Sequence, residues 1–365
     1  MSSSIGRAFK VQIFGESHGK MIGVTIDGLP AGIEIDEEWL NAYVQRRAAK
    51  GSAIATPRRE SDIPHIISGV NPQGKSTGYP LTAVFENSNT HSGDYSFLPD
   101  RPRPGHADYP AITRSLGEDD LRGSGHHSGR LTLPHVFAGG IAMLLLKQLG
   151  VEIAAHILQV GDVRDRSIDP VEPDLEALRL CHTREVPALD EAAGEKMMQT
   201  ILDAKAQLDS VGGIVEGVAA GMPAGIGAPY FDGAEAAIAQ QLFSIPAVKG
   251  VEFGAGFGCA VMPGSEYNDP YYVEDGEIRT ERNAAGGLLG GITNGMPIIA
   301  RCAFRPTASI GKEQQTVSLS AAAIGKDAET TLTVKGRHDP CVAIRAVPVV
   351  EAAVAIALAD LYLQG

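Results

Sequence analysis

Residues 101–109, Arg-Pro-Arg-Pro-Gly-His-Ala-Asp-Tyr, bring two guanidinium groups, an imidazole and a carboxylate together in one short segment. Two prolines and a glycine disfavour a helix or a central strand, so we expect a stiff loop. Arginine suits phosphate and carboxylate groups because its donors form a planar fork. Histidine is the side chain best suited to proton transfer near neutral pH. The segment is therefore either a solvated basic loop or part of a site for an anionic ligand.

Two further segments combine the same residue types. Residues 14–19, Phe-Gly-Glu-Ser-His-Gly, place His18 in a turn between glycines, whose backbone amides can approach an anion closely. Residues 335–341, Lys-Gly-Arg-His-Asp-Pro-Cys, add two cations, an imidazole and a carboxylate. Each segment alone could be an ordinary turn or a structural ion pair. Three such loops beside apolar stretches are easier to explain if they converge on one site.

Other basic residues in glycine- and proline-rich loops could complete an anion-binding pocket, although any single one is more often a solvated surface charge. The candidates are Arg46, Arg47, Lys50, Arg58, Arg59, Arg130 and Arg305.

Several familiar motifs are absent or fail on context. Residues 254–258, Gly-Ala-Gly-Phe-Gly, are not a dinucleotide fingerprint, because Pro263 and Gly264 interrupt the helix that should follow. His126 and His127 are adjacent, so their side chains would diverge on a strand, and we predict no metal site. The four cysteines are far apart and form no CxxC pair, which suggests neither zinc nor a disulfide scaffold.

The composition narrows the class of protein. The chain has 365 residues, 44% of them hydrophobic, which is enough for a sizeable core. A net charge of −13 argues against nonspecific binding to nucleic acid or to an anionic membrane. The longest apolar runs, residues 136–146 and 352–359, are too short to span a bilayer. Residues 1–10 contain no apolar signal region, so we expect a soluble cytoplasmic protein.

Two internal echoes suggest that the chain is built from related halves. Gly-Leu-Pro-Ala-Gly-Ile at residues 28–33 returns as Gly-Met-Pro-Ala-Gly-Ile at 221–226. Each copy lies between a strand-like run and a helix-like run, and the helix-like runs are residues 37–47 and 234–243. Thr-Gly-Tyr-Pro-Leu at 77–81 similarly resembles Asn-Gly-Met-Pro-Ile at 294–298. We therefore predict a single domain, residues 1–365, made of two related halves, about 1–150 and 200–365.

Strand signals dominate, and three further helices are predicted. Residues 134–149 end at a glycine, residues 189–208 have helical spacing, and residues 348–363 begin at a proline, where proline is tolerated. Residues 348–363 carry few charges, which indicates that this third helix is mostly buried. Residues 307–335 are expected to be an extended loop or lid. Strands and helices do not alternate strictly, so a doubly wound parallel sheet is not favoured.

Taken together, the three polar segments resemble the chorismate synthase family. That family carries Gly-Glu-Ser-His-Gly, Arg-Pro-Gly-His-Ala-Asp and Gly-Arg-His-Asp-Pro-Cys, which stand here at residues 15–19, 103–108 and 336–341. Further matches, in the same order along nearly the whole chain, are residues 58–60, 247–252, 285–287, 306–310 and 344–348.

The resemblance implies an α+β fold, a β-α-β sandwich with helices between two antiparallel sheets and an internal pseudo-twofold repeat, assembled as a homotetramer. It implies conversion of the small molecule 5-enolpyruvylshikimate 3-phosphate to chorismate by a 1,4-anti elimination of phosphate. The family needs reduced FMN, which can lend electron density as phosphate departs and then recover it. NADP is also associated with the family, and the sequence leaves the source of reduced flavin open.

The resemblance also implies roles for individual residues. His18 would protonate the leaving phosphate, His106 would protonate the reduced flavin, and Asp339 would assist proton removal through flavin N5. The implied cofactor-binding residues are His126, His127, Ser128, Ala247, Gly290, Arg305, Pro306, Thr307, Ala308, Ser309 and Arg337. The implied substrate-binding residues are Ser17, Arg47, Arg130 and Arg337.

Several positions depart from the family pattern and keep an alternative open. His126, His127 and Leu131 stand where the family usually has arginine, serine and glutamate. Ala48 and Ala53 replace arginines, Pro246 replaces a common flavin-contacting asparagine, and Arg305 replaces a lysine. The alternative is a divergent paralogue that binds an anionic ligand with altered or lost activity. A noncatalytic assembly protein would give no reason for the three polar loops.

Overall fold

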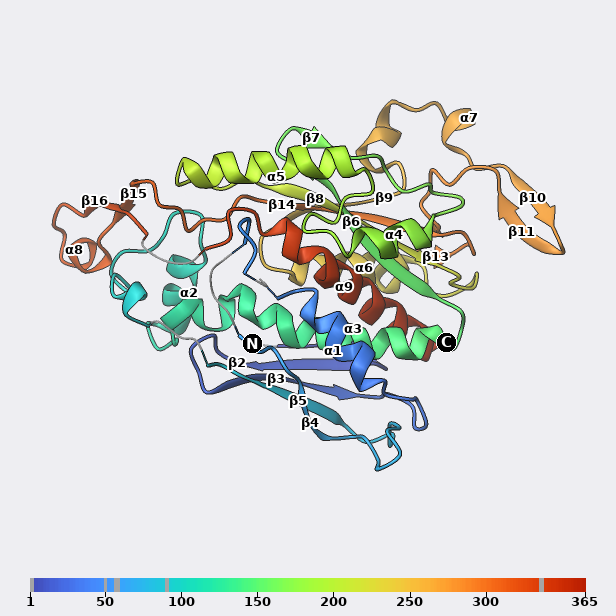
Figure 1. Cartoon of the computed structure of the whole chain (residues 1–365), viewed down its shortest axis with the longest axis horizontal. Helices are drawn as coiled ribbons and strands as arrows, with labels where there is room; N and C mark the ends of the chain where they lie inside the picture. The colour runs from blue at the N-terminus through green and yellow to red at the C-terminus, as the bar shows by residue number, and fades with distance from the viewer. Residues whose placement is uncertain (1–2, 49–50, 56–59, 89–91, 335–337) are drawn as a thin grey trace.

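Two five-stranded antiparallel sheets enclose a layer of helices in the computed structural model of this chain (Figure 1). The structure describes residues 3–48, 51–55, 60–88, 92–334 and 338–365. This arrangement confirms the predicted α+β sandwich.

The first sheet has the strand order β1-β2-β3-β5-β4 and buries one face. Its strands are β1 (Ser4–Ile5), β2 (Lys10–Gly15), β3 (Met21–Asp27), β4 (His65–Ser68) and β5 (Leu81–Glu86). In β5 the side chains of Leu81, Ala83 and Phe85 are fully buried, whereas the residues between them are partly exposed. Successive side chains of a strand point to opposite faces, so this alternation aims one face at the helices.

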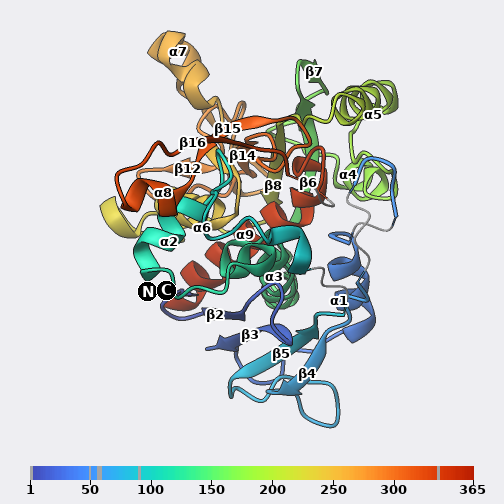
Figure 2. The same ribbon diagram turned by 90° about the vertical axis from the view of Figure 1, so that its left-hand side faces the viewer.

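The second sheet has the order β7-β6-β8-β14-β9 and is covered on both faces. Its strands are β6 (Glu152–Val160), β7 (Val163–Arg164), β8 (Gly213–Ala220), β9 (Val248–Phe253) and β14 (Ile298–Phe304). Helices α4 (Leu175–Cys181) and α5 (Glu191–Ala206) lie on its outer side (Figures 1 and 2). Residues inside β6 and β8 are therefore buried nearly without interruption, instead of alternating.

Four helices fill the space between the sheets: α1 (Glu37–Gln45), α3 (Thr132–Lys147), α6 (Ala234–Ser244) and α9 (Ala343–Gln364). Helix α3 packs on β3 of the first sheet, and α9 packs on β6 and β8 of the second. The two helices touch closely at Gly139, where an added Cβ would lie 2.2 Å from the Cβ of Ala352. Only glycine permits this approach, so the contact fixes the distance between the two sheets.

The predicted start of the C-terminal helix is wrong. Helix α9 begins at Ala343, five residues before Pro348, which lies inside the helix. Proline lacks an N–H, but near the start of a helix this deprives only one or two carbonyls of a partner. The early start brings Arg345 to the inner end of the helix, where the cavity described below opens.

By length and composition alone, two helical stretches among the described residues could cross a membrane: Arg122–Lys147, which consists of α3 and the short 3-10 helices before it, and Ala343–Gln364. Their most apolar windows are 78% and 83% buried inside the fold. Burial between two sheets explains their composition, because a helix enclosed on all sides is apolar all round.

The two sequence echoes form the same structure in both halves. In the first half, the Ser76 hydroxyl donates to the Pro30 carbonyl at 2.6 Å and accepts from the Ile33 amide at 2.9 Å. In the second half, the Thr293 hydroxyl makes the equivalent bonds, also at 2.6 and 2.9 Å. We call each arrangement a hydroxyl clasp. Four strands of each sheet also correspond in order, β2-β3-β5-β4 in the first sheet and β6-β8-β14-β9 in the second. Descent of the halves from one ancestor stays a prediction.

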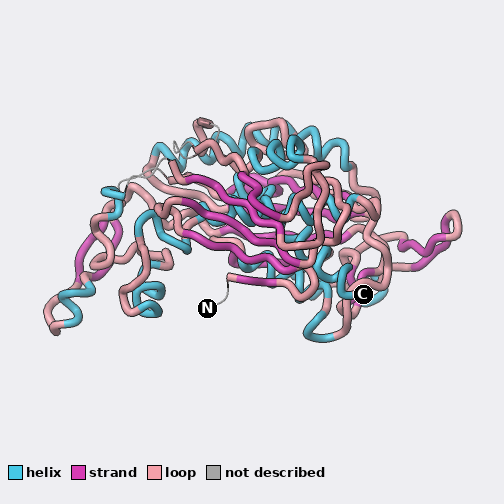
Figure 3. The backbone as a smooth tube through the Cα atoms, turned by 90° about the horizontal axis from the view of Figure 1, so that it is seen from below, coloured by secondary structure: helices cyan, strands magenta, loops and turns pink. Residues whose placement is uncertain are grey.

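Short elements project at opposite ends of the molecule (Figure 3). At one end is the hairpin β10 (Tyr271–Glu274) and β11 (Glu277–Thr280), near α7 (Gly264–Tyr267). At the other, β15 (Gln314–Val317), α8 (Leu319–Ala323) and β16 (Glu329–Leu332) lie within residues 307–335, where the sequence predicted an extended loop or lid, so short elements alternate with loops there. Further short elements in the part of the chain that the structure describes are α2 (Asp108–Ser115), β12 (Leu288–Leu289), β13 (Ile292–Thr293) and five 3-10 helices.

Candidate active site

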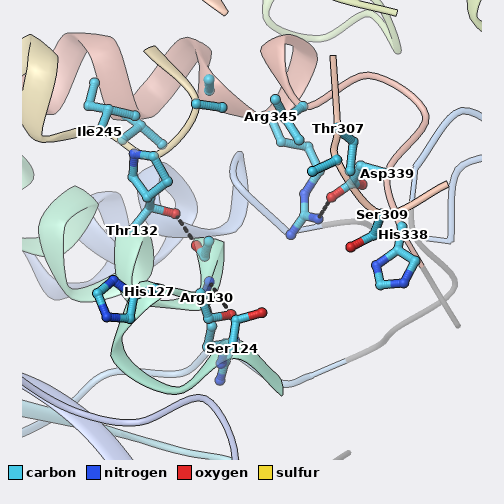
Figure 4. A pocket seen from close by; sticks show the side chains of 18 of the residues that line it. Ser124, His127, Arg130, Thr132, Ile245, Thr307, Ser309, His338, Asp339 and Arg345 are labelled. Atoms are coloured by element: carbon cyan, nitrogen blue, oxygen red, sulfur yellow. Dashed lines mark hydrogen bonds and ion pairs between the residues drawn. The ribbon is translucent and has the colours of Figure 1, made fainter. Parts of the chain in front are cut away.

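A cavity of about 460 Å³ opens where α1 ends and where α3 and α9 begin (Figure 4). Its volume is within the range of roughly 300–1,000 Å³ that is typical of ligand pockets. Loops before α2, after β14 and before α9 complete the wall, so the second and third polar segments of the sequence reach the same space.

His106 is held by a buried pair of charged residues. Its Nδ1 lies 2.7 Å from Oδ1 of Asp108, and the guanidinium of Arg103 bonds both oxygens of that carboxylate, at 2.7 and 2.8 Å. Arg103 and Asp108 are 3% and 2% exposed. A carboxylate at Nδ1 orients the ring and directs Nε2 away from it. His106 lines the cavity, so Nε2 is the nitrogen available to a ligand.

This environment keeps His106 neutral at neutral pH. Burial lowers its pKa, Asp108 acts in the opposite direction, and the nearby Arg103 cation adds to the lowering. Burial would raise the pKa of Asp108, but hydrogen bonds from Arg103 and His106 hold it well below its usual range. Because Arg103 already compensates Asp108, that carboxylate cannot stabilise a second cation fully.

Two buried arginines, Arg47 and Arg130, converge on the carboxylate of Asp62. Arg47 Nη1 lies 3.5 Å from Oδ2 of Asp62, and Arg130 Nη1 forms a short contact with Oδ1. Thr132 and Gly129 accept from Arg47 at 2.7 and 2.9 Å, so the start of α3 also fixes this side chain. Burial and the neighbouring Arg345 lower the pKa of Arg47 to about 9, and it remains a cation at neutral pH.

Asp339 faces the cavity and is paired with the first turn of α9. Arg345 Nη1 donates to Oδ2 of Asp339 at 2.7 Å, and Arg345 Nε donates to the Arg47 carbonyl at 2.9 Å (Figure 4). This chain of contacts connects the candidate base to the candidate anion-binding arginines.

Two buried polar atoms in the cavity wall have no hydrogen-bond partner among the described residues: Oγ1 of Thr307 and Nε2 of His338. Burial and the Arg103 cation lower the pKa of His338 to about 4, so its imidazole is neutral. An unpaired buried donor or acceptor is costly in a folded protein unless a ligand satisfies it. Thr307 belongs to the implied FMN-binding segment, so the wall fits a polar cofactor there.

His18 and Ser17 lie behind the cavity wall. The left-handed Gly123 lines the cavity, and a Cβ added to it would lie 2.4 Å from the His18 ring and 2.9 Å from the Ser17 hydroxyl. The His18 ring also meets the edge of Tyr95, with ring centroids 5.6 Å apart. His18 is therefore separated from the cavity by the backbone of Gly123.

The predicted site residues fall into three groups. Those that line the cavity are Arg47, His106, His127, Ser128, Arg130, Ala247, Arg305, Thr307, Ala308, Ser309 and Asp339. Those that do not are Ser17, His18, His126, Gly290 and Pro306. His126 bonds the Gly15 carbonyl at 2.9 Å instead, and Gly290 lies in the turn between β12 and β13. Arg337 is outside the described residues.

The positions that depart from the family pattern are also distributed. Ala48 and Pro246 line the cavity, so their small or apolar side chains change its wall directly. Leu131 is buried before α3. The carbonyl of Ala53 accepts from Lys205 of α5, so this loop contacts the second half of the fold.

Sequence reasoning missed several residues that shape the site, among them Asp62, Asp108, Ser124 and His338. Asp108 and His338 belong to quoted motifs, so the motifs themselves were the available signal. Asp62 and Ser124 carry no pattern, because their partners Arg130 and Arg103 are distant in sequence. Among the described residues, no group of three or more His, Cys, Asp or Glu side chains is arranged to hold a metal ion.

Comparison with known proteins gives one consistent result. The family model described as "Chorismate synthase" matches residues 9–363. The chorismate synthase of Methanobrevibacter smithii is 44% identical over 362 residues, covering 99% of this chain and 96% of the relative. The chorismate synthase of Thermococcus gammatolerans is 46% identical, and the match covers 97% of this chain and 96% of the relative. A solved structure described as "Crystal Structure of Chorismate Synthase" matches with a TM-score of 0.76 at 26% identity, covering 99% and 93%.

Proposed function

Because this chain belongs to the chorismate synthase family, we propose that its cavity binds 5-enolpyruvylshikimate 3-phosphate and expels phosphate from it by a 1,4-anti elimination. The product is chorismate, and the protein is a carbon–oxygen lyase acting on phosphates. The observation that carries the proposal is that His106, Asp339 and the buried arginines, far apart in sequence, line one cavity. A paralogue with lost activity is not favoured, because relatives along nearly the whole chain are named chorismate synthase.

The arginines supply the fixed charge that the substrate needs. A leaving phosphate and ring carboxylates are stabilised by guanidinium groups that are already oriented before binding. Asp62 orients Arg47 and Arg130, and Asp339 orients Arg345. Among the described residues that line the cavity, five arginines (Arg47, Arg103, Arg130, Arg305 and Arg345) outnumber three carboxylates (Glu60, Asp62 and Asp339), so the wall keeps a net positive charge for an anionic substrate.

The proton-handling groups are divided between two sides of the cavity. His106 presents Nε2 from the side of α2, and Asp339 presents its carboxylate from the start of α9. We propose that Asp339 assists removal of the proton that the elimination takes from carbon. We propose that His18 assists departure of the phosphate, although Gly123 must move aside for direct contact.

We propose that reduced FMN binds in the same cavity, held by Arg305, Thr307 and Ser309 with the imidazole of His338 beside them. When bound, reduced FMN supplies electron density as the phosphate leaves and recovers it afterwards. The unpaired Oγ1 of Thr307 and Nε2 of His338 support this placement, because a polar ligand would satisfy both.

Thr307→Val tests the cofactor placement without turnover. Valine has nearly the same shape but no hydroxyl, so it removes a buried unpaired group from the free protein. We expect the apoprotein to be at least as stable as wild type, while FMN binds about tenfold more weakly from loss of roughly one hydrogen bond. Titration of FMN fluorescence and a thermal melt measure both. Unchanged FMN affinity would place the cofactor elsewhere.

The reaction itself is tested by anaerobic turnover of 5-enolpyruvylshikimate 3-phosphate with chemically reduced FMN, following chorismate and phosphate together. We expect both products in equal amounts, with His106→Ala inactive. His65→Ala is the matched control, because His65 is an exposed histidine of β4. Absence of product from folded, flavin-saturated wild type would overturn the proposed function.

We also propose that the protein assembles as a homotetramer in the cytoplasm. Large apolar side chains on its surface support self-association, among them Tyr230, Phe231 and Phe257, which are 89%, 95% and 85% exposed. Light scattering coupled to gel filtration measures the assembly, and a monomer at micromolar concentration would contradict this proposal.

A further inference from the structure

Ser124 has an unfavourable backbone conformation at the cavity wall. Its φ is 72° and its ψ is 11°, and it lies between Gly123 and Gly125, which also have positive φ. Glycine adopts this left-handed region freely, whereas a residue with a Cβ does so at a cost. Strain of this kind persists where the side chain makes a contact that the site requires.

The contact is with the residue that holds His106. Ser124 is 7% exposed, and its hydroxyl oxygen accepts a hydrogen bond from Arg103 Nη2 at 3.0 Å. The same Nη2 lies 2.7 Å from Asp108 Oδ1 and 3.1 Å from His106 Nδ1. Three acceptors or potential acceptors therefore surround one nitrogen.

Counting hydrogens shows what the hydroxyl does. Nη2 of a guanidinium has two hydrogens, and the carboxylate of Asp108 takes one. The second can go to the Ser124 hydroxyl or to His106 Nδ1, and the latter is possible only if Nδ1 carries no proton. If Ser124 takes the second hydrogen, Nδ1 is free to be protonated and to donate to Asp108 at 2.7 Å.

We propose that Ser124 is a positioning residue that fixes the tautomer of His106. By occupying the second hydrogen of Arg103 Nη2, it keeps the His106 proton on Nδ1, facing Asp108, and leaves Nε2 open to the cavity. The inference deepens the proposed function, since it rests on His106 as the proton-handling group. Ser124 acts through Arg103 and does not itself have to touch the reacting atoms.

The charged and titratable groups around His106 are compatible with this assignment. Arg103 faces the ring from the same loop as His106, and Asp108 faces it from the start of α2. Arg305 faces it from the end of β14, and His338 from the loop before α9. Of these four groups, Asp108 alone is an anion, so it is the natural acceptor for the Nδ1 proton.

The test separates the hydroxyl from the backbone strain with three variants. Ser124→Gly removes both, Ser124→Ala removes the hydroxyl and keeps the strain, and Ser124→Thr keeps both and adds a β-branched side chain, which fits the left-handed region less well. Leu116→Gly is the control for strain, because Leu116 also has a positive φ of 57° but is 88% exposed.

The first readout is acylation of His106 by diethyl pyrocarbonate in the apoprotein, followed by peptide mass spectrometry. The reagent attacks the unprotonated nitrogen of a neutral imidazole, so an open Nε2 reacts and an Nε2–H tautomer with Nδ1 engaged does not. We expect the plateau rate at alkaline pH to fall about tenfold in Ser124→Gly and Ser124→Ala, which corresponds to a tautomer preference near 1.4 kcal/mol. Ser124→Thr should react like wild type.

The second readout is the split between kcat and KM. For both variants that lack the hydroxyl we expect kcat to fall about tenfold with KM nearly unchanged, because proton transfer is affected and substrate binding is not. In thermal melts Ser124→Ala and Ser124→Thr should unfold below wild type, whereas Leu116→Gly should unfold at or above it with full activity. A purely structural role would move the melts and leave the acylation rate alone.

Wild-type acylation rates in Ser124→Gly and Ser124→Ala would overturn the proposal, and so would a Ser124→Thr protein that reacts as slowly as Ser124→Gly. These outcomes are independent of turnover. If wild type forms no chorismate, the proposed function fails, while the acylation rates still decide whether Ser124 sets the tautomer.

Discussion

His106 and His156 each have a carboxylate at Nδ1, yet His106 faces the cavity and His156 does not. His106 Nδ1 lies 2.7 Å from Asp108, and 16% of its side chain is exposed. His156, in β6, lies 3.2 Å from Asp165 at Nδ1 and 3.1 Å from Glu216 at Nε2, with no exposure at all. Burial lowers the pKa of both, but the hydrogen bonds to Asp165 and Glu216 outweigh it for His156 and raise its pKa.

The difference shows that a neighbouring carboxylate does not by itself make a histidine catalytic. Arg103 already compensates Asp108, so His106 stays neutral and keeps one nitrogen for a ligand. His156 has a carboxylate at each nitrogen, which favours its protonated form and leaves no nitrogen for a ligand. The first arrangement suits proton transfer, and the second suits the joining of β6 to β8.

The largest expected effect is on turnover. His106→Ala should reduce kcat by about 10²–10⁴-fold, the usual contribution of a positioned acid or base, and should change the melting temperature little. Steady-state kinetics and a thermal melt on the same preparation measure both. A His106→Ala protein with wild-type kcat would show that His106 does not take part in proton transfer.

His156→Ala should show the opposite pattern. Its removal leaves two buried carboxylates without their shared cation, which costs about 3–5 kcal/mol of unfolding free energy. Urea denaturation measures this loss, and the folded fraction should retain wild-type kcat. His156→Gln is the milder control because its amide can still donate to one carboxylate. Loss of kcat in fully folded His156→Gln would show that this cluster also serves the reaction.

Glu216→Gln should make the surroundings of His156 resemble those of His106. The neutral amide leaves one carboxylate at His156, so the histidine pKa should fall and unfolding free energy should drop by roughly 1–3 kcal/mol, the usual effect of losing a charged hydrogen bond. Part of that loss comes from Arg301, which donates to Glu216 at 2.8 Å. An NMR titration of His156 measures the pKa, and an unchanged value would contradict the role given to Glu216.

The smallest effect is the pH dependence of stability, and the two histidines should give opposite signs. The pKa of His156 is raised by folding, so its contribution is complete below about pH 6.5 and is lost as pH rises through the folded pKa, by at most ~1.4 kcal/mol per pH unit. Folding lowers the pKa of His106. The contribution of His106 to stability is therefore complete above about pH 6.5 and is lost as the pH falls from there through the lowered pKa of the folded state. Thermal melts across pH 5–9 measure both effects. His156→Gln should reduce the loss of stability at high pH, and His106→Ala should reduce the loss at low pH.

The sequence indicated the architecture well where a local pattern decides it. The helix predicted at residues 234–243 is α6, Ala234–Ser244, because its flanking turn and apolar spacing act locally. Helix α9 was predicted too short, since proline is favoured at a helix start and the pattern says nothing of the burial that extends the helix upstream. Ser124 stands in a Gly-Ser-Gly run that looks like any loop, and only its contact with Arg103, 21 residues away, gives it a role.

The central position of α9 has a consequence for biosynthesis. This helix follows in the chain all the strands of both sheets, yet it lies between them and is packed against α3. The two sheets therefore cannot close on each other until residues 343–364 have left the ribosome. Until then the surfaces of α3, β6 and β8 that contact α9 stay uncovered, so the growing chain exposes apolar surface for longer than one whose core is complete early.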